Sequence, residues 1–362
     1  MLGIHSNVFE HAMEVIPKQG SEEVDSAGTS PTAAPTPCRS LTRLTTRSLS
    51  FSDCTGEVCE HDEHSSDEVP SCLRLHVGAI QIPHPDKIDH GGEDSYFVCG
   101  DGATVGVADG VSEWGWRFGV NPRGFADELM QAACREAQQT LQSADVISVE
   151  SRAQRILSIG FDSVKAFGAA TALVATLDAE GSRLGVANLG DSGLLQLRRS
   201  TTTNRTEVVG RTAEQLHSFN KPYQLTRLPA PADFPRLYSE GKTALVQAVK
   251  RCRPQKFDSP CDSDTYSLKV QVGDLIILGS DGVFDNLHDS EICALVDGQV
   301  SRAVDRTVDP ECVANAIAEA AKSNSQDKTA DTPFGQYVRE AGFEYSGGIQ
   351  DDITVLAAWI SN

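Results

Sequence analysis

The sequence has no long apolar run and few basic residues for the number of its acids. No apolar stretch approaches the roughly 18 residues of a membrane-spanning helix, so we expect no membrane insertion. Lys and Arg number 31 against 51 Asp and Glu, which gives a formal net charge of -20. A surface of this charge repels nucleic acid and anionic lipid, so neither is an expected partner.

Cysteines are present but form no spaced framework. The 362 residues include 10 cysteines, and these are scattered instead of following the intervals of a small disulfide-rich domain. Several fall within apolar or helical patterns, where a reduced cysteine packs as a small hydrophobe. These are Cys99, Cys134, Cys293 and Cys312. Because no secretory signal is recognisable, we expect a reducing, intracellular location.

The first 72 residues differ in composition from the rest. Ser, Thr, Pro and acidic residues dominate, and apolar periodicity ends at Val15, so we predict a disordered tail over residues 1–72. The basic, hydroxyl-rich patch 38–51 is typical of organelle transit peptides. Acidic residues precede it, however, and transit peptides avoid them. The predicted location is therefore either cytoplasmic or organellar, as in mitochondria.

From Leu73 the pattern changes to strands and helices, which we assign to one domain over residues 73–362. Apolar runs predict strands at 75–82, 96–99, 103–108, 170–177, 183–188, 194–197, 267–272, 275–279 and 353–360. Periodicity predicts helices at 121–141, 149–165, 243–251, 289–296 and 310–322. Strands and helices arrive in runs, which favours a layered α+β sandwich over an alternating βαβ fold.

Two finer features belong to this part of the chain. Residues 228–260 lack a clear pattern apart from the helix at 243–251, and we interpret them as an irregular insert. Gly273-Asp274 separates the strands at 267–272 and 275–279, and such a pair predicts a hairpin.

Acidic residues recur where predicted strands begin or end. Asp109-Gly110 directly follows the buried strand 103–108, where a charge is unfavourable unless a cation meets it. Five such positions occur, at Glu93-Asp94, Asp109, Asp191, Asp281 and Asp351-Asp352. Carboxylates gathered in one place repel one another unless cations lie between them. Carboxylate and carbonyl oxygens suit hard divalent ions, so the pattern indicates a shared metal site.

Six motifs along the chain resemble, in their order, those of the metal-dependent Ser/Thr protein phosphatases of type 2C. They are GGEDS, GVADGV, GAATA, ANLGDSG, GSDGVFDN and GGIQDDITV, and the resemblance covers residues 77–360. It is greatest to the branch that includes mitochondrial phosphatases. The resemblance implies an α-β-β-α sandwich with two central, mostly antiparallel sheets. It also implies phosphoprotein substrates and two, or with a weaker site three, Mn²⁺ or Mg²⁺ ions.

The resemblance assigns a role to each acid of the expected metal pair. Asp109 would bridge the two ions, and the carboxylate of Glu93 with the carbonyl of Gly110 would bind one of them. Asp281 and Asp351 would bind the other. Such ions lower the pKa of a bridging water, whose hydroxide attacks phosphorus in line without a covalent enzyme intermediate.

Further acids are assigned around this pair. Asp94, counted among the metal-binding residues, and Asp352 would hydrogen-bond to water molecules on the ions. Asp191 matches the weaker third position of the family, together with Asp281 and Asp285.

The sequence departs from the family at two points. Many members carry a histidine after the first Asp-Gly, as a general acid for the leaving oxygen, whereas this chain has Val111. Many also carry an arginine before the acidic pair to hold phosphate, and this chain has none there. We predict that Lys87 or Arg117 takes this catalytic role. A lysine acts as a point charge, so phosphate binding would be weaker.

Other protein classes share part of these signals. GDSG at 190–193 also occurs in trypsin-like proteases, but His84 and His90 lie in an unsuitable loop and the paired cysteines are missing. No His-Cys pair occurs, which excludes a cysteine-dependent phosphatase. The alternative that stays open is a phosphatase-like binding or scaffold module without strong activity. Such modules usually lose a metal aspartate, and none is lost here, which favours an enzyme. We expect the protein to be a monomer.

Removal of the tail tests the predicted domain boundary. A chain beginning near Ser71 should retain most of the turnover of the full chain, because every motif lies beyond that point. Hydrolysis of a phosphoprotein by the two chains is the measurement. A shortened protein that folds, by circular dichroism, but has no activity would show that the tail contributes to the site.

Overall fold

The computed structural model describes residues 73–100, 102–140, 147–178, 182–251, 256–302 and 308–362. The predictions for the tail, residues 1–72, lie outside the described residues. Within the described part, no helix combines the length and the apolar sequence needed to cross a membrane.

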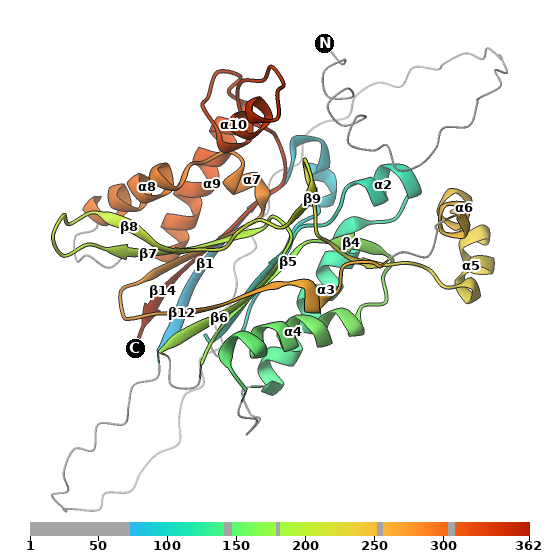
Figure 1. Cartoon of the computed structure of the whole chain (residues 1–362), viewed down its shortest axis with the longest axis horizontal. Coiled ribbons are helices and arrows are strands. Elements are labelled where there is room, and N and C mark those ends of the chain that lie inside the picture. Colours follow the sequence, from blue (N-terminus) through green and yellow to red (C-terminus); the bar gives the residue numbers. More distant parts are fainter. Residues whose placement is uncertain (1–72, 101, 141–146, 179–181, 252–255, 303–307) are drawn as a thin grey trace, which may run out of the picture. The chain divides into compact units, whose positions relative to one another are not determined.

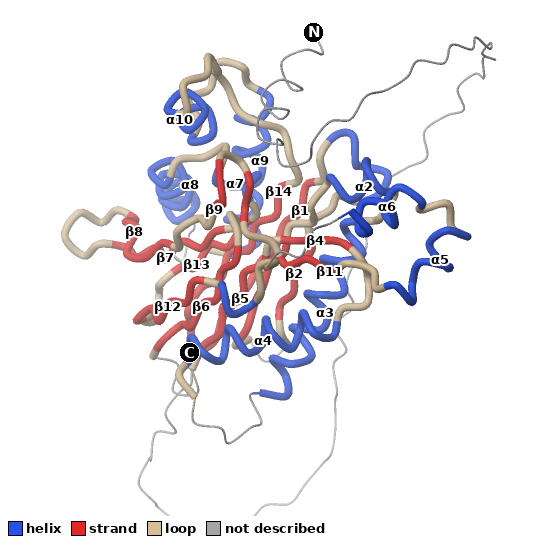
Figure 2. The backbone as a smooth tube through the Cα atoms, turned by 45° about the vertical axis from the view of Figure 1, so that its right-hand side comes forward, coloured by secondary structure: helices blue, strands red, loops and turns tan. Residues whose placement is uncertain are grey.

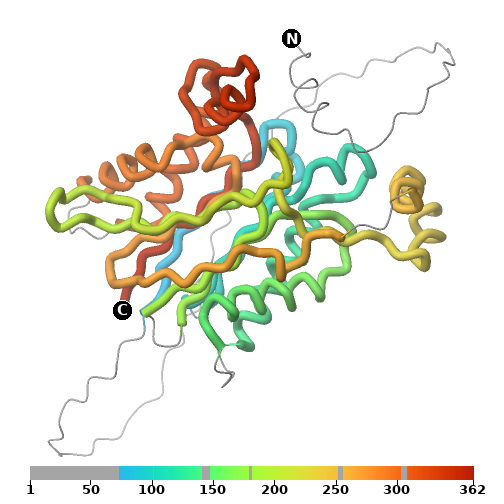
Figure 3. Tube along the Cα trace, viewed as in Figure 1, coloured from blue at the N-terminus to red at the C-terminus, as the bar shows by residue number. Residues whose placement is uncertain are grey.

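Two five-stranded antiparallel sheets form the centre of the domain (Figure 1). The first sheet has the order β1 (Arg74–Ile82), β14 (Ile353–Ser361), β13 (Leu275–Gly279), β7 (Gly193–Arg199) and β8 (Thr206–Arg211). The second has the order β12 (Asp264–Lys269), β6 (Arg183–Leu189), β5 (Ala172–Leu177), β3 (Thr104–Ala108) and β2 (Ser95–Val98). The first and last strands of the domain pair over nine residues, as the adjacent blue and red tubes of Figure 3 show. The predicted antiparallel sheets are thus confirmed.

Helices cover the outer face of each sheet, and Figure 2 shows them on both sides of the strands. α3 (Pro122–Thr140) and α4 (Val149–Ser163) pack on the second sheet. α8 (Asp289–Arg302) and α9 (Pro310–Gln326) pack on the first. The order of layers is therefore helix, sheet, sheet, helix, which confirms the predicted α+β sandwich.

The core between the two sheets follows from strand alternation. Side chains of a strand point alternately to its two faces, and Val105 and Val107 of β3 both point to the inter-sheet core. There they join Leu278 of β13 and Leu356 of β14, all at most 1% exposed. Each such side chain contributes about 1.5–3 kcal/mol when it leaves water. The opposite face of β3 packs on α3. Ala108 lies on that face and belongs to the separate core between the second sheet and its helices.

Several short elements were not predicted. The helices are α2 (Glu113–Phe118), α5 (Phe234–Ser239), α7 (Asp281–Phe284), α10 (Pro333–Glu340) and the 3₁₀ turns η1 (Pro85–His90), η2 (Pro231–Asp233) and η3 (Pro260–Asp262). The strands are β4 (Gly168–Ala170), β8, β9 (Leu216–Ser218), β10 (Lys221–Pro222) and β11 (Leu225–Arg227). Most of these are shorter than the windows in which periodicity can be measured.

The insert at 228–260 is less irregular than predicted. It contains η2 and α5 in addition to α6 (Thr243–Arg251), the helix that periodicity predicted. Leu245 and Val246 of α6 are buried in a small core with Trp114 of α2. The insert therefore packs on the helix that follows the first Asp-Gly.

The predicted hairpin at Gly273-Asp274 is wrong. β12 pairs with β6 in the second sheet, whereas β13 pairs with β14 and β7 in the first, so the connection passes from one sheet to the other. The Asp274 side chain is fully buried at this crossing, where it accepts hydrogen bonds from Arg198 and Gln196 of β7. These partners hold the start of β13 in the first sheet. A local turn signal cannot reveal them, because they lie about 76 residues earlier in the chain.

Asp274→Ala should lower the free energy of unfolding by about 2–4 kcal/mol, because it leaves Arg198 and Gln196 without their buried acceptor. Denaturant titration is the measurement. The matched control is Asp331→Ala, since Asp331 also pairs with an arginine but its side chain is 81% exposed. That change should cost no more than about 1 kcal/mol. Equal effects of the two substitutions would contradict a stabilising role for Asp274.

Candidate metal centre

Asp109-Gly110 follows β3 and is held by β4. The backbone carbonyl of Asp109 accepts from the N–H of Thr171 at 3.0 Å, and Gly110 forms a β-bridge with Ala170. A Cβ on Gly110 would lie 2.8 Å from the carbonyl oxygen of Glu93 and 2.9 Å from that of Pro122. Only glycine fits this space, so Gly110 brings the backbone of Glu93 beside the turn.

A second glycine brings the end of β13 against the start of β14. α7 begins at Asp281, directly after Ser280, and Gly282 follows. A Cβ on Gly282 would lie only 2.1 Å from the carbonyl oxygen of Asp352. The close approach places Asp281 beside the Asp351-Asp352 pair, although 70 residues separate the two segments.

Asp94 connects the two sheets at this same end. Its side chain is fully buried, and its Oδ2 accepts hydrogen bonds from Ser280 Oγ at 2.6 Å and Thr354 Oγ1 at 2.7 Å. Thr354 lies in β14 of the first sheet and Ser280 directly follows β13 of that sheet, whereas Asp94 directly precedes β2 of the second. Burial, together with the charge of Asp352, raises the pKa of Asp94 to about 7 despite the two hydrogen bonds.

The remaining acids interact with one another. Loss of solvation, followed by the charges of Asp281 and Asp94, raises the pKa of Asp109 well above its usual range. Loss of solvation and the charges of Asp351 and Asp191 do the same to the pKa of Asp281. The pKa of Asp191 itself is raised by burial to about 7. The structure therefore brings acids from five separate segments into one mutually repelling cluster.

Lys87 places a positive charge among these acids. Its Nζ lies 2.6 Å from Glu93 Oε2, 3.0 Å from Asp352 Oδ2 and 3.5 Å from Asp351 Oδ1, and it also donates to Ser112 Oγ at 3.0 Å. Burial lowers the pKa of Lys87, but the charges of Asp351 and Asp352 and the hydrogen bond to Glu93 outweigh it and raise this pKa above its usual value.

Arg117, the other predicted phosphate-binding cation, lies in a different setting. It pairs with Glu113 on its own helix α2, and its guanidinium lies 5.3 Å from the centre of the Phe118 ring. Val111, in the place of the family histidine, packs with the apolar cluster that includes Trp114. Its side chain therefore supports α2 and supplies no proton.

The chain was compared with protein families, curated proteins and solved structures. No family model matches it. Probable protein phosphatase 2C 55 of Arabidopsis thaliana is 34% identical over 289 residues, which cover 80% of this chain and 52% of that protein. Protein phosphatase PTC7 homolog fig of Drosophila mojavensis is 34% identical over 275 residues, which cover 74% and 77%. The chain belongs to the type 2C protein phosphatase family.

Structural similarity agrees with this membership. The X-ray structure of the photosystem II phosphatase PBCP matches with a TM-score of 0.62 at 30% identity, over 79% of this chain and 99% of that chain. The family and the fold that the sequence motifs predicted are thereby confirmed. The chain spans only about half the length of several of the curated relatives that it matches.

The donor set of this type 2C domain fits divalent cations in charge and chemistry. Asp94, Asp191 and Asp281 each have a buried Oδ1 without a hydrogen-bond partner. A buried carboxylate oxygen without a partner is unfavourable, and a hard metal ion is the partner that satisfies several at once. Within the described ranges, however, no three His, Cys, Asp or Glu side chains are already gathered as a metal-binding group. We therefore expect side-chain movement when an ion binds.

Sequence analysis missed several residues of this site. Ser280 and Thr354 directly hold Asp94, and Glu214 adds a negative charge that acts on Asp191 and Asp285. Ser280 precedes the second Asp-Gly and Thr354 follows Asp352, so their positions beside the motifs could have indicated them. Glu214 lies in a loop after β8, and no local pattern distinguishes it.

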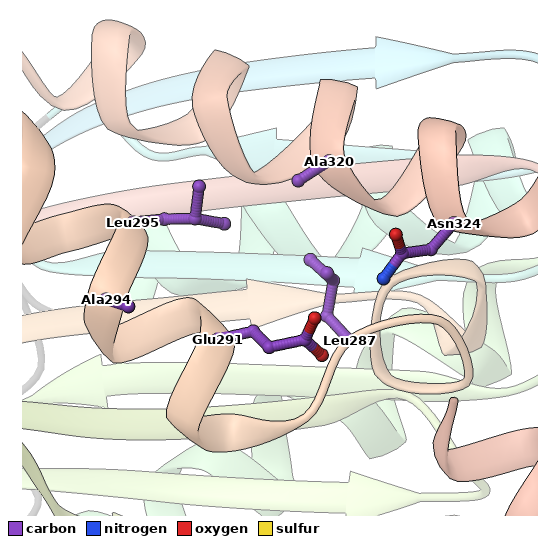
Figure 4. Close-up of a pocket in the computed structure, with 6 residues that line it drawn as sticks. All are labelled: Leu287, Glu291, Ala294, Leu295, Ala320 and Asn324. Carbon is purple, nitrogen blue, oxygen red and sulfur yellow. The ribbon is translucent and has the colours of Figure 1, made fainter. Parts of the chain in front are cut away.

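A pocket of about 310 Å³ lies elsewhere, between α8 and α9 (Figure 4). Leu287, Leu295 and Ala320 form much of its wall, and Glu291 and Asn324 add polar groups. None of the acids described above lines it. The candidate site is therefore the acidic cluster, and this pocket is separate from it.

Gly282→Ala should disrupt this end of both sheets, because its Cβ would overlap the backbone of Asp352. We expect a loss of more than about 2 kcal/mol in the free energy of unfolding. The control is Gly298→Ala in α8, where a Cβ would meet nothing within 4 Å. That helical substitution should instead stabilise the protein by about 0.5–1 kcal/mol. Thermal or denaturant unfolding measures both, and a neutral Gly282→Ala would contradict the close packing.

Proposed function

We propose that the chain is a metal-dependent protein phosphatase that hydrolyses phosphoserine and phosphothreonine. The observation that carries this proposal is the cluster of partly or fully buried acids, three of them with an unpartnered oxygen, in a member of the type 2C family. An acidic cluster of this kind is unfavourable for stability alone, which favours a site that receives cations. A scaffold module would have no need to retain it.

We assign the metal ligands to the acids at the sheet ends. Asp109, Glu93 and the carbonyl of Gly110 would hold one Mn²⁺ or Mg²⁺, and Asp109, Asp281 and Asp351 a second. Bound there, the ions would lower the pKa of a water molecule, so that hydroxide is available near neutral pH to attack phosphorus. They would also offset the negative charge of the phosphoryl group. Asp94 is fixed by two hydroxyl groups. Its other oxygen is therefore available to orient water in the site.

A third, weaker site would draw on the acids beyond this pair. Burial, followed by the charges of Asp191 and Glu214, raises the pKa of Asp285 well above its usual range. Burial, with smaller contributions from the charges of Glu214 and Asp351, raises the pKa of Asp191. Asp191, Asp281 and Asp285 together form the group that could hold this ion. Its occupancy would depend on the second ion, because the two would share Asp281.

Phosphate binding is assigned to Arg117 in preference to Lys87. The guanidinium of Arg117 has five N–H donors, and Glu113 accepts from only some of them. The Arg117 side chain is 33% exposed, so the remaining donors are accessible to a phosphate. Lys87 has three donors, and its four oxygen neighbours already use them. Because Val111 has no proton to give, we expect water to protonate the leaving oxygen.

The substrate class and the setting complete the proposal. A phosphoprotein must approach a chain with a net charge of -20, so cations in the site are needed to attract the phosphate. The names of the curated relatives as protein phosphatases support this substrate class. Action as a monomer, and a location in the cytoplasm or an organelle, are the further parts of this proposal.

Asp109→Asn should reduce phosphate release by roughly 10² to 10³, because it removes negative charge from the residue that would hold both cations. Without metal, the same change should leave the melting temperature unchanged or raise it, since one repelling carboxylate is neutralised. The measurement is a Mn²⁺ titration followed by phosphate release and by thermal melting. Asp331→Asn, on the exposed surface, is the control and should change neither.

Two results would contradict the proposed function. The first is wild-type turnover of a phosphopeptide that persists in excess chelator. The second is an Asp109→Asn protein as active as the wild type. Turnover of a small aryl phosphate but of no phosphopeptide would keep the chemistry and overturn the substrate class.

A further inference from the structure

Lys87 has an unusual number of negative neighbours. Three carboxylates, those of Glu93, Asp351 and Asp352, lie within 3.5 Å of its Nζ, and the hydroxyl of Ser112 lies at 3.0 Å. An ammonium group has three N–H donors and no acceptor. All of its donors therefore have oxygen partners within the site, and none is left for an incoming phosphate.

The loop that carries Lys87 is itself attached to these carboxylates. η1 begins after His84, whose backbone N–H donates to Asp352 Oδ1 at 2.7 Å. It ends at His90, and the N–H groups of the following Gly91 and Gly92 donate back to the carbonyls of Ile88 and Lys87. A Cβ on Gly92 would lie 2.5 Å from Asp352 Oδ1, so the loop and the carboxylate fit closely. Lys87 is thus held in place from both ends of a short turn.

Two of its carboxylate partners are the expected ligands of different metal ions, Glu93 of one and Asp351 of the other. We propose that Lys87 is a resident counter-ion of the metal centre, which a divalent cation must displace from Glu93 in order to bind. This inference rests on the proposed function. Lys87 stabilises the metal-free protein and at the same time weakens its affinity for metal. It is a positioning residue and does not hold the substrate.

The electrostatic reason is the balance of charge in this corner. With Lys87, one positive charge offsets three negative ones, and without it the three carboxylates repel one another unopposed. Unit charges a few ångström apart near a protein surface interact strongly, because water screens them only in part. Removing the ammonium therefore raises the energy of the metal-free state and takes away a repulsion that an entering cation would meet. Both effects favour the bound state.

Lys87→Met tests this inference, because methionine has a similar length and no charge. The probe is Mn²⁺ alone, and its binding to the 362-residue chain is measured by calorimetric titration and by thermal melting. We expect the metal-free melting temperature to fall by about 4 °C or more. We expect the dissociation constant for Mn²⁺ to fall by about tenfold. The control is Lys256→Met, whose ammonium lies 2.6 Å from Asp262 but whose side chain is 78% exposed.

A second variant keeps the test valid if Lys87→Met does not fold without metal. Lys87→Arg retains the charge, so its Mn²⁺ affinity and its metal-free stability should stay near those of the wild type. If Lys87→Met is unfolded, added Mn²⁺ should restore the fold at concentrations below those that saturate the wild type.

Two results would contradict the role of Lys87 as a counter-ion. Equal or weaker Mn²⁺ binding by Lys87→Met would overturn it, as would tighter binding by Lys87→Arg. A raised KM for a phosphopeptide with unchanged Mn²⁺ affinity would instead identify Lys87 as the phosphate-binding residue. Wild-type protein that binds no Mn²⁺ would overturn the proposed function as well, so the two failures can be told apart.

Discussion

The repulsion among acids at the shared end of the two sheets is the constraint on which the rest of this site depends. Asp94, Asp109, Asp191 and Asp281 come from separate segments, and each has a pKa raised by burial or by its neighbours. Folding must bring them together against this repulsion. The core between the sheets provides the opposing free energy, because it fixes the strands whose ends carry the acids.

Two kinds of local device make this crowding tolerable. Hydroxyl groups of Ser280 and Thr354 donate to Asp94 and link the two sheets at their acidic end. The ammonium of Lys87 lies among the carboxylates of Glu93, Asp351 and Asp352. The Oδ1 atoms of Asp94, Asp191 and Asp281 still have no hydrogen-bond partner. The negative charge of the site is therefore only partly offset within the protein. A partly neutralised site is the arrangement that divalent ions can still enter.

The insert is connected to this site by packing on α2. Leu245 and Val246 of the insert pack with Trp114, and α2 begins directly after Ser112, which contacts both Lys87 and Glu93. A change in the insert would therefore reach the acids through the position of α2. The loss of the family histidine fits the same packing, since Val111 contributes to this apolar cluster.

The sequence by itself determined the α+β class, most strands and long helices, the family, and the acids of the candidate site. These rest on local information: alternation along β3 or β14, periodicity along α3, and Asp-Gly pairs after apolar strands. It could not determine which sheet β12 and β13 join, because the partners of Asp274 lie on β7. Nor could it place Glu214 beside Asp191, or Lys87 among three carboxylates. Such contacts join residues far apart in the chain, so only tertiary packing decides them.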